Sequence, residues 1–454
     1  MGNRMGQELH GSRGLGGYFA FPRPAEASSD LSDEVPEAPH HPFRTATESM
    51  STLKGHALIG QSGGPTAVIN QSLVGLVERC VEHRDITGVY GALNGIRGII
   101  EERLVDLGRE SREELERVAL TPAAALGSVR QKPTAEACER VLEVFAAHDI
   151  RYFFYVGGND SAETAHLLNE AALAKGYDVR LFHVPKTIDN DLAGCDHTPG
   201  YGSAAKFVAQ AFMGDDEDNR SLGGVKINVV MGRHAGWLTA ASRLARRNEG
   251  DGPHLIYLPE KAFDRDRFCD RVEEMLHQHG RCLVAVSEGI HDADGELIAK
   301  GKEVDSHGNV QLSGTGALGD YLSGLVKSKV TAAKRVRADT FGYLQRSYFG
   351  IASEQDALEA REVGRAAVEY ATSGELTHGS IAIQRGEEGG SYQPVYAALA
   401  LSEVAAATRL VPDEFFKGDD DISEAFVEWA TPIVGPLPTP GRLASHRVER
   451  KLGS

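Results

Sequence analysis

Short apolar runs alternate with longer segments of helical periodicity from about residue 56 onward. The first run, 57–59, leads into a glycine-rich turn, and the apolar spacing of Val68, Leu73, Val74 and Leu76 then predicts a helix. Further apolar runs predict strands at 88–90, 152–156, 179–184, 227–230, 255–258, 283–286, 336–341 and 380–383. Strands separated by helices are typical of parallel sheets, and this many strands fit two sheets better than one. The pattern therefore predicts an α/β fold with two mostly parallel sheets.

Residues 1–54 differ from the rest of the chain, because they are rich in Gly, Pro, Ser and acids and lack sustained periodicity. We expect a poorly ordered extension there, with Met50 as a candidate start. The acidic runs 215–218 and 419–421 are expected to be solvated loops. No apolar run approaches the roughly 18 residues of a membrane span, and the N-terminus lacks the layout of a secretory signal. These features favour a cytoplasmic protein with no membrane partner.

Composition narrows the range of ligands. The chain has 454 residues and a net charge of −17, which argues against nucleic acid as a main partner. A phosphate ligand would therefore need a local basic pocket. The five cysteines are scattered and form no CxxC pair, which is typical of reduced thiols that fill a core.

A lysine and two carboxylates follow the strand predicted at 179–184. Lys186, Asp189 and Asp191 lie within six residues of one another, in the sequence PKTIDND. This set suits phosphoryl transfer, because the cation holds a phosphate, one carboxylate takes a proton from an attacking hydroxyl, and the other helps to hold a metal.

Two glycine-rich loops also follow predicted strands, at 60–66 (GQSGGPT) and 157–161 (GGNDS). Backbone N–H groups in such loops approach anions closely at the start of a helix. A glycine turn is equally a common feature of fold geometry, and Asp160 or Ser161 would suit a helix cap. Two such loops beside the lysine segment favour the phosphate-binding interpretation.

Basic and acidic side chains follow the later strands. They lie in Met231-Gly232-Arg233, at Glu288, and in the segment 337–346, RADTFGYLQR. Arginines with a tyrosine and a glutamate could grip a sugar phosphate and its hydroxyls. Taken singly, each of them could equally be an ordinary surface residue.

The ordered set GQSGGP, GGNDS, PKTIDND, MGR, SEG and GYLQR resembles the phosphofructokinase superfamily, which phosphorylates fructose 6-phosphate at O1. The resemblance runs from about residue 56 to 346. It implies two Rossmann-like α/β/α domains with the active site in the cleft between them. The donor domain would comprise 55–200 plus about 346–395, and the sugar-phosphate domain 201–345 plus about 396–430, with a C-terminal tail at 431–454.

The resemblance also implies roles for single residues. Asp189 would be the general base, and Arg337 would reach the sugar phosphate of a neighbouring subunit, which implies a homodimer or homotetramer. The donor would be bound by Gly64, Arg130, Asp160 and Lys186. Fructose 6-phosphate would be bound by Thr187, Ile188, Asp189, Met231, Gly232, Arg233, Glu288, Arg337, Tyr343 and Arg346.

Two positions favour pyrophosphate as the donor. ATP-using members of the family carry glycine where this chain has Asp160 and Lys186. A carboxylate about 4 Å from the α-phosphate of ATP would repel it by roughly 4 kcal/mol in a partly exposed site. Pyrophosphate would escape that clash, and Lys186 would stabilise the transferring charge. An ATP-dependent phosphofructokinase and a silent regulatory subunit that binds sugar phosphate remain the alternatives.

The resemblance implies Mg²⁺ as the cofactor. Many members have aspartate, as a magnesium contact, where this chain has Asn159. An amide oxygen binds Mg²⁺ without contributing charge, so Asp189, Asp191, the donor oxygens and water would share the metal.

Overall fold

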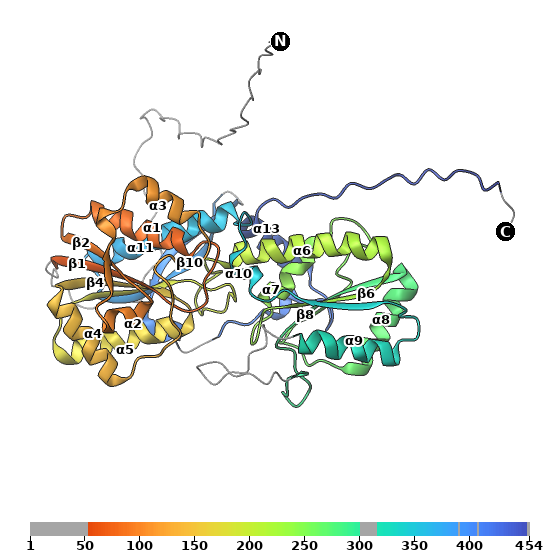
Figure 1. Ribbon diagram of the computed structural model, residues 1–454, viewed down its shortest axis with the longest axis horizontal. Coiled ribbons are helices and arrows are strands. Elements are labelled where there is room, and N and C mark those ends of the chain that lie inside the picture. Colours follow the sequence, from red (N-terminus) through yellow and green to blue (C-terminus); the bar gives the residue numbers. More distant parts are fainter. Residues whose placement is uncertain (1–52, 300–315, 389–390, 406–407, 452–454) are drawn as a thin grey trace, which may run out of the picture. The chain divides into compact units, whose positions relative to one another are not determined.

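The computed structural model describes residues 53–299, 316–388, 391–405 and 408–451, and within these residues the strands form two sheets (Figure 1). The larger sheet has the order β11 (Ser391–Leu399), β10 (His378–Glu388), β5 (Arg180–Pro185), β4 (Ile150–Gly157), β1 (Gly55–Gln61), β2 (Ile86–Ala92) and β3 (Leu104–Asp106). The smaller sheet has the order β7 (Leu255–Tyr257), β8 (Arg281–Ser287), β6 (Gly224–Val230) and β9 (Val336–Thr340). Among the described strands, only the edge strands β3 and β11 pair in antiparallel fashion. The predicted α/β fold is confirmed.

Helices cover both faces of each sheet (Figure 1). The larger sheet packs against α1 (Ile69–Glu82), α3 (Arg112–Ala119) and α11 (Glu354–Thr372) on one face, and α2 (Gly95–Ile100), α4 (Ala135–Ala147) and α5 (Asn159–Lys175) on the other. The smaller sheet packs against α6 (Tyr201–Leu222), α7 (Trp237–Ala240) and α13 (Glu424–Val434), and on its other face against α8 (Arg265–His279) and α9 (Ala317–Lys329). The described residues also form the short helices α10 (Leu344–Ser347) and α12 (Leu401–Ala405) and 3-10 turns at Leu107–Arg109, Ala241–Ala245 and Asp413–Phe415.

The central strands are apolar on both faces because both faces are covered. In β4, Phe153 packs in the cluster that contains α4 and α5, while its neighbour Phe154 packs in the cluster that contains α1 and α11. Successive side chains of a strand point to opposite faces, so an unbroken apolar run is what a doubly covered sheet requires. This is why the sequence pattern located these strands.

Two strands were not predicted, and both are edge strands. β3 has three residues, and β11 contains Pro394 and alternates between exposed and half-buried positions. Edge strands need neither length nor a continuous apolar run. The extension predicted for residues 1–54 lies almost wholly outside the described residues, and the domain limits stay predictions.

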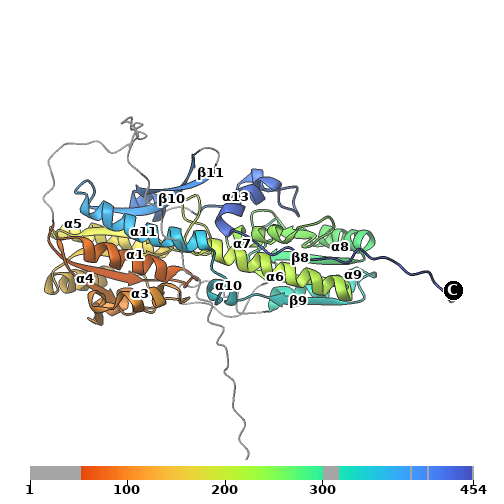
Figure 2. The ribbon, with the colours of Figure 1, turned by 90° about the horizontal axis from the view of Figure 1, so that it is seen from above.

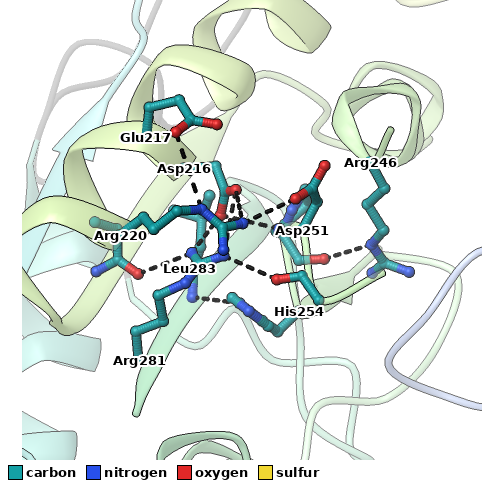
Figure 3. A network of polar contacts seen from close by, with 12 residues as sticks. Asp216, Glu217, Arg220, Arg246, Asp251, His254, Arg281 and Leu283 are labelled. Carbon is teal, nitrogen blue, oxygen red and sulfur yellow. Dashed lines mark hydrogen bonds and ion pairs between the residues drawn. The ribbon is translucent and has the colours of Figure 1, made fainter. Parts of the chain in front are cut away.

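The prediction of solvated loops was wrong for the run 215–218, whereas the run 419–421 does lie in a loop, which is partly buried. The run 215–218 lies inside α6, where Asp216 is buried and pairs with Arg281 at the start of β8 (Figure 3). Asp420 is also buried, and it pairs with Arg271 of α8 at 2.7 Å. Each carboxylate is neutralised by an arginine far away in the sequence, which local composition does not reveal.

All five cysteines are buried and unpaired, as the sequence predicted. Burial raises the pKa of the thiols of Cys195 and Cys282 to about 12. Among the described helices, none is both long and apolar enough to cross a lipid bilayer.

Candidate active site

The sheet order brings the predicted loops together. The strands β5, β4 and β1 are neighbours, and the segments that follow them carry 186–191, 158–161 and 62–66. In the smaller sheet β8, β6 and β9 are neighbours, and they are followed by Glu288, 231–233 and 343–346. Ligands of open α/β sheets bind at the carboxyl ends of strands, where these six segments lie.

One pocket is lined by residues from both sets of loops. Among the predicted site residues, it is lined by Gly64, Arg130, Asn159, Asp160, Lys186, Thr187, Ile188, Asp189, Met231, Arg233, Glu288, Tyr343 and Arg346. Gly232 and Arg337 do not line it. Gly232 has φ 145°, and a Cβ there would lie 2.6 Å from the carbonyl oxygen of Ala235, so glycine is needed for the shape of the loop. Arg337 is exposed on the edge strand β9.

Lys186 is a buried cation at the centre of the pocket wall. Its side chain is 2 % exposed, and Nζ donates a hydrogen bond to the carbonyl oxygen of Gly64 at 2.7 Å. Burial lowers its pKa to about 8, and the nearby carboxylate of Asp189 opposes that shift. The ammonium is therefore mainly charged at neutral pH and is poised to meet an anion.

The side chain of Asp189 is exposed to the pocket, and the atoms of the pocket wall lie around it. That surrounding protein raises the pKa of Asp189, while Lys186, Arg346 and Arg130 act in the opposite direction. The pKa of Asp191 is raised to about 7, first by burial and then by the negative charge of Asp189. Carboxyls with raised pKa values, lying opposite cations in a cleft, are typical of acid–base sites.

The loop that contains Asn159 offers oxygen ligands to a metal. The Oδ1 atom of Asn159 is buried without a hydrogen-bond partner, while Nδ2 donates to Asp191 at 2.9 Å. An amide oxygen beside two carboxylates fits Mg²⁺, which commonly takes one or two carboxylates and completes its shell with water and substrate phosphates. The described residues contain no cluster of three or more His, Cys, Asp or Glu suited to a metal, so those other ligands would be required.

Two arginines converge on the first glycine loop. A Cβ on Gly64 would lie 2.7 Å from a guanidinium nitrogen of Arg346 and 3.7 Å from one of Arg130. Arg346 also lies over the ring of Tyr343, with its guanidinium carbon 4.5 Å from the ring centroid. The pKa of Arg346 is lowered, first by burial and then by Arg130. Clustered cations of this kind are suited to a polyanionic ligand.

Asp160 is more exposed than the partly exposed site expected from the sequence. Helix α5 begins at Asn159 with Gly158 as its N-cap, so Asp160 lies in the first turn and is not the cap. Its side chain is 64 % exposed, and one carboxylate oxygen lies 3.5 Å from Nζ of Lys132. Solvent and Lys132 both screen the charge, so its repulsion of a third phosphate is weaker than the value estimated for a partly exposed pair.

Several pocket residues were missed by sequence reasoning. His234 follows the MGR motif directly, and its pKa is lowered first by burial and then by Arg233. Its position next to that motif was a usable signal. Thr408 also lines the pocket and forms an antiparallel bridge with Leu192 across more than 200 positions, for which the sequence offers no signal.

Comparison with known proteins agrees with this geometry. Residues 56–371 match the phosphofructokinase family. A Rhodospirillum rubrum protein named pyrophosphate--fructose 6-phosphate 1-phosphotransferase is 52% identical over 406 residues, covering 88% of this chain and 99% of that protein. A Halomonas elongata protein of the same name is 39% identical over 417 residues, covering 87% and 98%. The crystal structure of a pyrophosphate-dependent phosphofructokinase from Nitrosospira multiformis matches with a TM-score of 0.76 and 34% identity, over 86% of this chain and 94% of that one. This chain therefore belongs to the phosphofructokinase family of phosphotransferase enzymes.

Proposed function

We propose that this enzyme transfers a phosphoryl group reversibly from pyrophosphate to O1 of fructose 6-phosphate, with Mg²⁺, giving fructose 1,6-bisphosphate and phosphate. The observation that carries the proposal is the buried ammonium of Lys186, which lies at Gly64 and beside Asp189 in one pocket. The names of the Rhodospirillum and Halomonas relatives support the same donor and acceptor.

In this mechanism Asp189 is the general base. Its carboxylate takes the proton of the 1-hydroxyl as O1 forms its bond to phosphorus, and the bond from phosphorus to the departing phosphate breaks. Thr187 supports Asp189, since its Oγ1 accepts a hydrogen bond from the backbone N–H of Asp189 at 3.1 Å. In the reverse direction Asp189 returns the proton to O1.

The cationic side chains of the pocket would serve two ligands, the phosphoryl donor and the sugar phosphate. Lys186 and Arg130 line the pocket, and on the donor side they would neutralise the charge that develops on the leaving phosphate. Arg233, Glu288 and Tyr343 come from the smaller sheet and would hold the phosphate and hydroxyls of the sugar, with Arg346 at the boundary. Asn159 and Asp191 would hold Mg²⁺, which, when bound, supplies charge neutralisation at the donor oxygens.

The donor comparison tests this proposal directly. With fructose 6-phosphate and magnesium, we expect kcat/KM for pyrophosphate to exceed that for ATP by at least about 10²-fold, since a buried ammonium suits the short donor. Coupled detection of fructose 1,6-bisphosphate gives both values. Preference for ATP would overturn the donor assignment. Absence of turnover with both donors, while sugar phosphate still binds, would favour the regulatory subunit.

The exposure of Asp160 gives a second expectation. Asp160→Gly should keep kcat/KM for pyrophosphate within about tenfold of the wild-type value, because the carboxylate is screened by solvent and by Lys132. The same variant should gain measurable ATP activity, because the steric obstacle is removed. Steady-state kinetics with each donor measures both effects. A collapse of pyrophosphate activity would show that Asp160 contacts the donor directly.

We also propose a homodimer or homotetramer that works in the cytoplasm. Arg337 is exposed on β9, so it is available to a neighbouring subunit. Leu344, Tyr348 and Phe349 follow within the next 12 positions and are 64%, 49% and 71% exposed, which is typical of an interaction surface. The free thiols of the chain fit a reducing compartment.

A further inference from the structure

The segment 186–200 between β5 and α6, which we name the catalytic loop, is closed at its base by its own hydrogen bonds. The backbone N–H of Thr187 donates to the carbonyl oxygen of Pro199 at 3.2 Å, and the hydroxyl of Thr198 donates to the carbonyl oxygen of Thr187 at 2.8 Å. Residues 197–199 therefore lie next to Thr187, at the start of the loop. Whatever fixes them also fixes Thr187 and, through it, Asp189.

The side chain of His197, next to Thr198 in the chain, lies between two carboxylates. Its side chain is fully buried, its Nδ1 lies 2.9 Å from a carboxylate oxygen of Asp196, and its Nε2 contacts the carboxylate of Glu359 in α11. Carboxylate oxygens only accept hydrogen bonds, so both ring nitrogens must donate. The side chain is therefore an imidazolium inside the protein.

The groups around His197 balance its charge. Glu359 also accepts from the hydroxyl of Tyr392 in β11 at 2.5 Å. Asp196 also accepts from Arg385 in β10 at 3.1 Å and from the indole of Trp429 in α13 at 3.0 Å. Two cations thus face two anions. Burial acts to lower the pKa of His197, but its bonds to Asp196 and Glu359 outweigh burial and raise it to about 9.

Besides the contact of Glu359 with His197, a second carboxylate of helix α11 binds the end of the catalytic loop. Asp356 lies one turn before Glu359, and its carboxylate accepts from the backbone N–H of Gly200 and of Ser203, each at 2.8 Å. Figure 2 shows α11 reaching the beginning of α6, where the loop ends. Two buried carboxylates on one face of α11 therefore anchor the segment that leaves the active site.

We propose that His197 is a positioning residue, whose imidazolium, gripped by Asp196 and Glu359, keeps the catalytic loop in the shape that presents Lys186 and Asp189 to the reacting phosphate. This inference rests on the proposed function for its activity readout. The residues proposed to bind the sugar phosphate lie on other elements, since Arg233 follows β6 and Glu288 follows β8 in the smaller sheet. Loosening the loop should therefore disturb turnover more than sugar-phosphate binding.

The first test is His197→Gln, which keeps hydrogen-bonding capacity but loses the positive charge. We expect kcat with pyrophosphate to fall about 10- to 100-fold, with KM for fructose 6-phosphate within about threefold of wild type. Tyr392→Phe removes one hydrogen bond to Glu359 and should give a smaller loss in the same direction, which keeps the test open if H197Q does not fold. An unchanged kcat in both variants, or a KM that rises as much as kcat falls, would overturn the proposal.

The second test uses pH and needs no activity. Because the pKa of His197 is raised in the folded protein, its charge stabilises the fold fully below about pH 6.5, and this contribution is lost as pH rises through about 9. The gap in melting temperature between wild type and H197Q should therefore be widest at pH 6 and shrink toward pH 10. A gap that does not change with pH would show that His197 only fills space.

His254→Gln is the matched control. His254 lies just before β7, away from the pocket, and its Nδ1 accepts from the backbone N–H of Leu283 at 2.9 Å (Figure 3). H254Q should lower the melting temperature while kcat stays at the wild-type value. An equal loss of kcat in H254Q and H197Q would refute the proposal. If wild type itself shows no turnover, the proposed function fails, while the melting experiment still decides the charge of His197.

Discussion

Asparagine in place of Asp189 is expected to lower kcat for phosphoryl transfer about 10³-fold, within the range found when a general base is removed. The amide is nearly the same size as the carboxylate but cannot take the proton of the 1-hydroxyl. Because the pocket keeps its shape and its arginines, KM for fructose 6-phosphate should stay within about fivefold. Initial rates with pyrophosphate and varied sugar phosphate measure both quantities.

Asp191→Asn is the control for this variant. Asp191 lies two residues further along the catalytic loop, where it accepts from Asn159 and is a candidate magnesium ligand. Its variant should raise the magnesium concentration needed for half-maximal rate and should reduce kcat less at saturating magnesium. If D189N keeps more than a tenth of wild-type kcat, Asp189 is not the base.

Methionine in place of Lys186 should lower kcat with pyrophosphate about 10²- to 10³-fold, the loss typical of removing one preorganised charge from the transition state. Methionine fills much of the same buried space, so the loss of kcat is caused mainly by the missing ammonium and only slightly by an empty cavity. The hydrogen bond to the carbonyl oxygen of Gly64 is also lost. Titration calorimetry with fructose 6-phosphate checks that the variant still binds the sugar phosphate.

Lys132→Met provides the comparison. Lys132 pairs with Asp160 and Glu163 but does not line the pocket, and it is about half exposed. Its loss should change kcat by less than about threefold, as expected for an exposed ion pair. Similar rates in K186M and K132M would mean that the buried ammonium has no special part in catalysis.

The sequence predicted the parts of the fold that carry the site. The central strands could be located because burial on both faces demands continuous apolar runs, and each motif followed such a strand. Parallel pairing then places those motifs at one edge of each sheet. The edge strand β11 escaped detection because it is half exposed and interrupted by Pro394.

Ion pairs between residues far apart in the chain could not be predicted from the sequence. Asp216 seemed to be part of a solvated acidic run, because its partner Arg281 lies 65 positions away. His197 and Glu359 are separated by 162 positions. The motif around Asp160 identified the right place in the pocket, but its exposure depends on where α5 begins and on Lys132. Such pairings are fixed only when the helices pack on the sheets.

The burial of every sulfhydryl in the chain has a practical consequence. Since all five cysteines are enclosed in the folded state, a single cysteine introduced at an exposed position would be the one fast-reacting group for maleimide dyes. The native sequence is therefore a ready background for attaching fluorophores or spin labels on either side of the pocket. Any change in distance across the pocket when substrates bind could then be followed without first removing a natural residue.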